Sequence, residues 1–141
     1  MNKSLYGILF AFLFVGCASP KYATSVKSTQ LAKSTKSWDG QKLPPYERGT
    51  PEVTILRITV PPKHTLPMHR HPGINAGVLL KGELTVTTKS GKVLRLKPND
   101  SIIEVVDTWH YGRNDGNVPA EIIVFYAGIE GESITIKKSG H

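Results

Sequence analysis

The chain has 141 residues, a formal net charge of +7 and a single cysteine. This length suits one folded domain, and one cysteine excludes a disulfide bond within the chain. We predict no nucleic-acid partner, because the excess charge lies in residues 18–42, with five lysines against one aspartate, whereas residues 43–141 carry twelve basic and ten acidic side chains.

The chain starts with a short apolar segment. Lys3 precedes an apolar run over residues 5–15, and the small residues Gly16 and Cys17 follow. A positive end, a short apolar core and a small-residue cleavage site are typical of a secretory signal peptide. The run is too short to cross a bilayer core of about 30 Å as a helix. We therefore predict a signal peptide over residues 1–16.

The end of this segment, FVGC, resembles the lipobox of bacterial lipoproteins, with Phe14 in place of the usual leucine. The resemblance implies that Cys17 is lipidated and becomes the mature N-terminus, and Ala18 after it resembles a signal for sorting to the outer membrane. A simply cleaved signal peptide is the alternative. Residues 17–42, rich in serine, threonine and lysine, are predicted to be a flexible tether. The expected location is the bacterial cell envelope, at the outer membrane or periplasmic face, with membrane contact only through the lipid.

Residues 43–141 are predicted to form a single all-β domain, and Trp38 and Tyr46 are expected to pack on it. Within Val53–Val60, side chains of alternating polarity indicate a half-buried strand. Lys81-Gly82 is interpreted as a tight hairpin turn between two further strands. Short strands at intervals of about ten residues predict a sandwich or barrel. The remaining expected strands are Leu66–His71, Asn75–Leu80, Glu83–Thr88, Lys92–Leu96, Ser101–Val106, Trp109–Tyr111, Ala120–Gly128 and Ser133–Lys137.

Two histidines, His69 and His71, are separated by one residue in a predicted strand. Side chains at positions i and i+2 of a strand lie on the same face, so both imidazoles are expected to project into one space while Arg70 faces away. Imidazole suits zinc, iron, manganese, nickel or copper. The pattern alone leaves a metal site and a structural pair of histidines both open, and His64, in a proline-bounded loop, is interpreted as a surface residue.

The stretches HRHPGINAGVLLKG and LKPNDSIIEVVDTWHYGRN resemble the two conserved motifs of the cupin superfamily, in its small single-domain, cupin-2 type. The matching positions are His69, His71, Asn75 and Gly82 in the first stretch and Pro98, His110 and Asn114 in the second. About 25 residues separate the two stretches, and the likeness extends over roughly residues 52–126.

The resemblance implies a cupin-type β-barrel, a jelly-roll-like double-stranded β-helix, that holds one divalent transition metal ion. Carried over by position, His69, His71 and His110 are metal ligands. Asn114 is implied to stabilise a turn, and Gly82 to permit the hairpin.

One position departs from the family pattern, because Asn75 stands where the family usually has a glutamate ligand. In one interpretation, three histidines hold the ion, and its other positions stay open or take the weaker oxygen donor of Asn75. In the other, a second carboxylate elsewhere in the chain completes the site. Glu104 is the candidate, because a carboxylate within the apolar run SIIEVV is costly to bury unless it is paired or bound to metal. Exposure to solvent, or pairing with Arg70 or Arg113, is the alternative for Glu104.

Three functions remain open for a protein of this kind. The metal centre is that of an oxygenase, isomerase or lyase that acts on a small molecule, or the barrel is a non-catalytic module that binds a small molecule or a metal, or it is only a scaffold. A small-molecule ligand or substrate is the expected partner, and a homodimer is a further expected form of the protein. We find no phosphate-binding loop, nucleophile elbow or zinc-finger cysteine pair in the sequence.

Overall fold

The computed structural model describes residues 25–139, so the predicted signal peptide and Cys17 lie outside the described residues. Within this range the chain forms strands and no helix. Accordingly, the described part of the chain contains no helix that is long and apolar enough to cross a membrane. The strands are β1 (Pro51–Val60), β2 (His69–Arg70), β3 (Ile74–Lys81), β4 (Leu84–Thr88), β5 (Val93–Leu96), β6 (Ser101–Ile103), β7 (His110–Arg113), β8 (Ala120–Ile129) and β9 (Ile136–Lys137).

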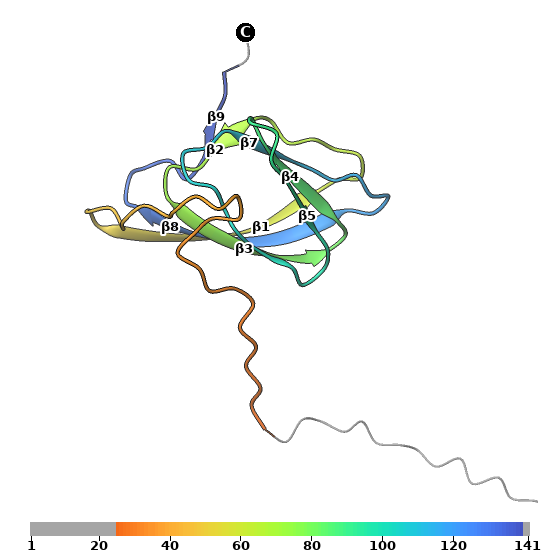
Figure 1. The fold of residues 1–141 in the computed structure, drawn as a ribbon, viewed down its shortest axis with the longest axis horizontal. Coiled ribbons are helices and arrows are strands. Elements are labelled where there is room, and N and C mark those ends of the chain that lie inside the picture. The colour runs from red at the N-terminus through yellow and green to blue at the C-terminus, as the bar shows by residue number, and fades with distance from the viewer. Residues whose placement is uncertain (1–24, 140–141) are drawn as a thin grey trace, which may run out of the picture.

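Two antiparallel sheets face each other across the interior. One has the order β1-β8-β3-β6 and the other the order β5-β4-β7-β2-β9. Figure 1 shows β1, β3 and β8 on one side of the interior and β2, β4 and β7 on the other. The predicted all-β, jelly-roll fold is confirmed, and its strands form two separate sheets and not one continuously hydrogen-bonded barrel.

The core follows from alternation along the strands, since every second side chain of a strand points to the same face. In β8, Ala120, Ile122, Val124 and Tyr126 are buried while the residues between them are more exposed. β4 repeats the pattern with Leu84, Val86 and Thr88. The remaining buried apolar side chains of the cluster are Val60, Leu79, Leu96 and Ile102.

The predicted hairpin at Lys81-Gly82 is wrong, because β3 and β4 belong to different sheets and do not pair. Gly82 has a φ of +72°, and a Cβ at this position would lie 2.6 Å from the carbonyl oxygen of Pro119 and 2.8 Å from Cα of Ala120. Glycine is therefore required where the chain crosses from one sheet to the other beside the start of β8.

Three strands are shorter than the sequence pattern predicts. β2 covers His69–Arg70 of the expected Leu66–His71, β6 ends at Ile103, and β9 is reduced to Ile136–Lys137. After β6 the backbone turns away from the sheet, and Asp107 has a φ of 50°. By contrast, the turn at Ser90-Gly91 connects a true hairpin, in which β4 pairs with β5.

Asn114, predicted to stabilise a turn, is fully buried and bonds three backbone groups. Its amide nitrogen donates to the carbonyl oxygens of Val60, at 3.0 Å, and Val118, at 2.8 Å. Its side-chain oxygen accepts from the amide of Gly116 at 2.9 Å. Asn114 thus joins the end of β1 to the loop between β7 and β8.

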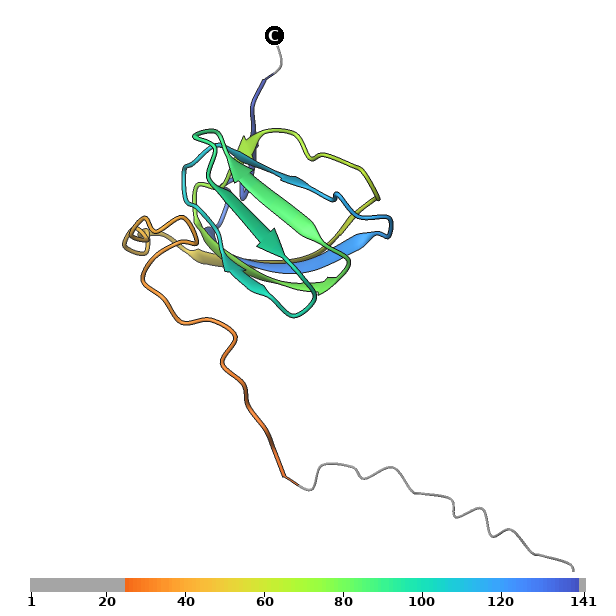
Figure 2. The same ribbon diagram turned by 45° about the vertical axis from the view of Figure 1, so that its right-hand side comes forward.

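The end of the predicted tether folds back onto the domain, as Figures 1 and 2 show for the orange chain that precedes β1. Trp38 packs against the core cluster, as predicted. Tyr46 does not, since its side chain is 83% exposed.

A candidate metal centre

Three histidines meet on the inner face of the second sheet. His69 in β2 lies directly opposite His110 in β7, so the two side chains share one face. His71, two residues beyond His69, forms a backbone bridge with Val106 and points to the same side. The ring centroids are 4.4 Å apart for His69 and His110, 5.0 Å for His69 and His71, and 5.1 Å for His71 and His110.

These three residues, the histidine cluster, could hold one metal ion. One ring nitrogen from each residue can be chosen so that all three lie within 4.8 Å of one another. His110 is 1% exposed and His71 is 5% exposed, whereas His69 is half-buried. The structure therefore brings together the three residues that the sequence motifs single out.

Backbone carbonyls fix the orientation of all three rings. Nδ1 of His69 lies 2.7 Å from the carbonyl oxygen of Pro67, Nδ1 of His71 lies 2.9 Å from that of Ile134, and Nδ1 of His110 lies 2.8 Å from that of Thr108. A carbonyl oxygen only accepts, so each Nδ1 carries the proton, and each neutral ring keeps its lone pair on Nε2. Metal-binding histidines are held in this way, with one nitrogen donating to the protein.

The buried Nε2 atom of His110 supports a fit to a metal ion. This atom has no hydrogen-bond partner among the described residues. A buried polar atom without a partner is rare in folded proteins and calls for an explanation, such as an ion. Because a neutral imidazole nitrogen is a good ligand for a divalent transition metal, the donor set fits such an ion.

Burial keeps the cluster neutral. It lowers the pKa of His71 to about 4 and holds the pKa values of His69 and His110 below their usual 6.5. The cause is the loss of hydration, which disfavours the charged imidazolium. At neutral pH, lone pairs and not protons are therefore available to a cation.

Glu104 lies beside the cluster but outside the group of three. Its carboxylate oxygen Oε2 is 3.9 Å from Nε2 of His110. The residue is 9% exposed, and loss of hydration raises the pKa of its carboxyl group to about 7. The alternative pairings with arginine are wrong, because Arg70 pairs with Asp107 and Arg113 pairs with Asp115.

Asn75, at the position where the family usually has glutamate, lies in β3 and is 1% exposed. Its side-chain oxygen has no partner among the described residues. Its side-chain nitrogen is 3.4 Å from the carbonyl oxygen of Gly73, at the long end of the range for a hydrogen bond. Asn75 therefore offers a free oxygen on the wall of the same cavity.

The cluster, Asn75 and Glu104 line a cavity of about 280 Å³ that opens to solvent. Apolar side chains of β1, β4 and β8 form much of the remaining wall, including Leu56, Ile58, Val86, Ile122 and Val124. A cavity of this size, lined by apolar groups and a few converging polar ones, is typical of a site for a small molecule.

Four further residues at the site were not identified from the sequence. Tyr126 contacts His71 edge-on at 5.4 Å between ring centroids, and the sequence of β8 does not mark it as inward because large apolar residues lie on both faces of the strand. Thr135 lies 3.2 Å from Nδ1 of His71, Lys137 lies opposite His69, and Trp38 bonds Glu104. No local sequence pattern predicts the contacts of Thr135, Lys137 and Trp38. His64 is exposed and lies outside the cluster, in agreement with its interpretation as a surface residue.

A family model described as a cupin domain matches residues 56–126, which is half of the chain. No curated protein matches the sequence. Among solved structures, an uncharacterized conserved protein from Klebsiella pneumoniae with a double-stranded β-helix domain has a TM-score of 0.54 and 19% identity. That match covers 67% of this chain and 90% of the Klebsiella chain.

Two solved enzymes also have similar folds. The DMSP lyase DddQ from Ruegeria pomeroyi has a TM-score of 0.53 and 21% identity, over 60% of this chain and 42% of the lyase. An oxalate oxidase in complex with the substrate analogue glycolate has a TM-score of 0.51 and 22% identity, over 60% of this chain and 45% of the oxidase. The chain thus spans less than half of either enzyme, and at these identities the likeness shows the fold alone.

Proposed function

Because the chain belongs to the cupin family, we propose that it binds one divalent transition metal ion through His69, His71 and His110 and uses it on a small molecule. The observation that carries the proposal is the orientation of three neutral imidazoles, each with Nδ1 held by a carbonyl, toward one apolar cavity. When bound, the ion would supply a Lewis-acid or redox centre.

The remaining polar groups of the cavity have roles of their own in this proposal. Glu104 is near enough to His110 to complete the ligand set or to exchange a proton with a bound molecule. Asn75 supplies a neutral oxygen with no other partner among the described residues. The apolar wall excludes water and selects a ligand with little charge outside the group that meets the histidine cluster.

The reaction class in the proposal is that of an oxygenase, isomerase or lyase. A lyase and an oxidase are among the proteins of similar fold, which supports a small-molecule substrate. The largely apolar wall of the cavity favours a second candidate, a module that binds a small molecule or a metal without turnover. Turnover of a substrate by the metal-loaded protein separates the two.

Metal analysis tests the central claim. We expect about one ion of iron, manganese, zinc, nickel or copper per chain in the purified full-length protein, or after metal-free protein is reconstituted with each ion in turn. Elemental analysis after gel filtration measures the ratio. A protein that remains free of all five metals after reconstitution contradicts the proposal.

We also propose that residues 1–16 direct export and that Cys17 carries the lipid that anchors the protein at the envelope. The motif FVGC and the lysine-rich tether support this assignment. Stable anchoring takes more than one acyl chain, which bacterial lipidation would supply. In fractionated cells, wild type should pellet with membranes and Cys17→Ser should not. If Cys17→Ser pellets as fully as wild type, another segment must anchor the protein to the membrane.

A further inference from the structure

The segment Ser37–Gln41, here called the strap, forms a compact turn ahead of the first strand. Its ends are closed by the amide of Ser37, which donates to the carbonyl of Gln41 at 2.9 Å, and by a bridge between Lys36 and Lys42. The hydroxyl of Ser37 also donates to the carboxylate of Asp39 at 2.7 Å. These local bonds give the strap a defined shape, although it lies within the predicted flexible tether.

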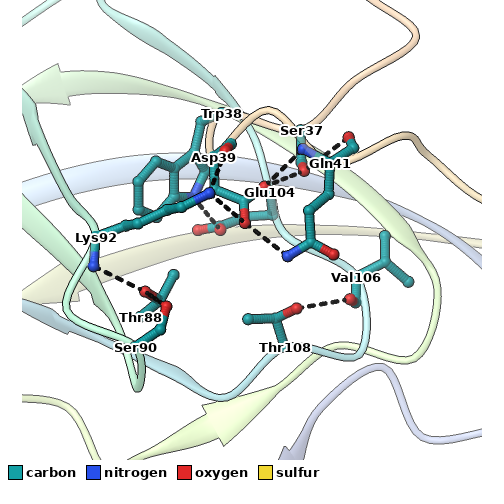
Figure 3. Close-up of polar contacts among 10 residues, drawn as sticks. All are labelled: Ser37, Trp38, Asp39, Gln41, Thr88, Ser90, Lys92, Glu104, Val106 and Thr108. Atoms are coloured by element: carbon teal, nitrogen blue, oxygen red, sulfur yellow. Dashed lines mark hydrogen bonds and ion pairs between the residues drawn. The ribbon is translucent and has the colours of Figure 1, made fainter.

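Two contacts fix the strap to the domain besides the indole of Trp38. The backbone amide of Trp38 donates to the carbonyl of Ile103, at the end of β6, at 2.9 Å. The ammonium group of Lys92 donates to the carbonyl of Asp39 at 2.7 Å and lies 3.7 Å from its carboxylate. Figure 3 shows the strap side chains gathered over Glu104.

The indole of Trp38 reaches the carboxylate of Glu104. Its Nε1–H donates to Oε2 at 3.3 Å, and the backbone amide of Val105 donates to the same oxygen at 3.2 Å. This oxygen is also the one that lies 3.9 Å from Nε2 of His110. Among the described residues, Trp38 supplies the only side-chain hydrogen bond to Glu104.

A buried carboxylate is costly unless donors satisfy it, and its position is set by those donors. The Val105 amide belongs to the next residue and moves with Glu104. The indole, in contrast, comes from a distant part of the chain and is a donor only. We propose that Trp38 is a positioning residue that holds the Glu104 carboxylate against the histidine cluster. The consequence for metal binding rests on the proposed function, whereas the contact itself does not.

The contact is tested first without metal, by the indole N–H resonances of the full-length protein. The chain has two tryptophans, Trp38 and Trp109, and Trp38→Phe assigns the two signals. At a pH above about 8, where the Glu104 carboxyl with its pKa of about 7 is ionised, Glu104→Gln should move the Trp38 signal upfield, because a charge-assisted hydrogen bond becomes a weaker neutral one. The Trp109 signal should stay in place. A Trp38 signal unmoved by Glu104→Gln would overturn the proposal.

The positioning role is then tested with Co²⁺ alone. Trp38→Phe keeps an aromatic ring against the core and removes the donor. It should weaken Co²⁺ binding about tenfold, the lower end of what is lost when a residue that orients a ligand is removed, and change the visible absorption of the bound ion. Ser37→Ala is the matched control, because it loosens the same turn without touching the indole, and it should bind Co²⁺ as wild type does.

The outcomes separate the inference from the proposed function. A wild type that binds Co²⁺, with Trp38→Phe equal to it in affinity and spectrum, overturns the positioning role. Equal losses in Trp38→Phe and Ser37→Ala overturn it too, because the effect would then come from the strap as a whole. A wild type that binds no Co²⁺ contradicts the proposed function, and the indole resonances then decide this inference.

Discussion

Replacing His110 with alanine should weaken the binding of a divalent transition metal more than about a hundredfold. Even the loss of a residue that only orients a ligand costs about 10- to 100-fold in metal affinity, and His110 is a proposed ligand. It is also the most deeply buried member of the cluster, at 1% exposure, so solvent cannot readily take its place. Competition with a chromophoric chelator measures the dissociation constants.

His64→Ala is the matched control for this experiment. His64 is the same residue type, is exposed and lies in a loop outside the cluster. Its removal should leave metal affinity within about twofold of wild type, in line with surface substitutions that touch no such feature. Tight binding retained in His110→Ala, or an equal loss in His64→Ala, would show that the metal is held elsewhere.

Replacing Gly82 with alanine should lower the free energy of unfolding by about 3 kcal/mol. The φ of +72° is strained for alanine, and the added Cβ would meet backbone atoms of Pro119 and Ala120 at 2.6 and 2.8 Å. Backbone cannot move aside as a flexible side chain can, so the crossing after β3 and the start of β8 must shift apart. Urea unfolding of the metal-free protein measures the loss.

Gly91 separates the two causes. It has a similar φ, +88°, but a Cβ there would meet nothing within 4 Å. Gly91→Ala should therefore lose only the conformational part, about 1 kcal/mol. If Gly82→Ala and Gly91→Ala are equally stable, the close approach to β8 does not constrain the crossing.

Strand positions could be predicted from the sequence because burial imposes an alternating pattern on it. The run from Leu84 to Thr88 alternates the apolar, buried Leu84 and Val86 with the more exposed Thr85 and Thr87, and β4 is found there. Turns rich in glycine and asparagine separated the strands correctly. These signals are local, and each is present within a window of about ten residues.

Strand pairing could not be predicted in the same way. Lys81-Gly82 between two apolar runs favours a hairpin, yet the structure uses the glycine for a crossing between sheets. What decides between the two is the approach of Pro119, which is distant in sequence. A local sequence pattern does not show which distant part of the chain will pack beside it, so the pairing could not be predicted.

At the candidate metal site, too, local spacing could be predicted and long-range contacts could not. The spacing of His69 and His71 predicts a shared face, and the structure brings His110 to that face, although their role as ligands stays a prediction. Glu104 was the candidate because a carboxylate within the apolar run SIIEVV is costly to bury unless it is paired or bound to metal. It does lie beside His110, but β6 ends before it and the positive φ of Asp107 breaks the register.

The pairing of β1 with β8 bears on the order in which the molecule can assemble. Val60 pairs with Ala120 and Pro51 with Ile129, so the longest ladder joins the two ends of the domain. β3 also needs β8 before it can join this sheet, because β8 lies between β3 and β1. During synthesis the first sheet cannot close until residue 129 is available, and pairing over such sequence distances makes folding slow. Until then the apolar inner face of β1 is exposed to solvent. The incomplete chain is therefore prone to aggregate with other chains until β8 has been synthesised.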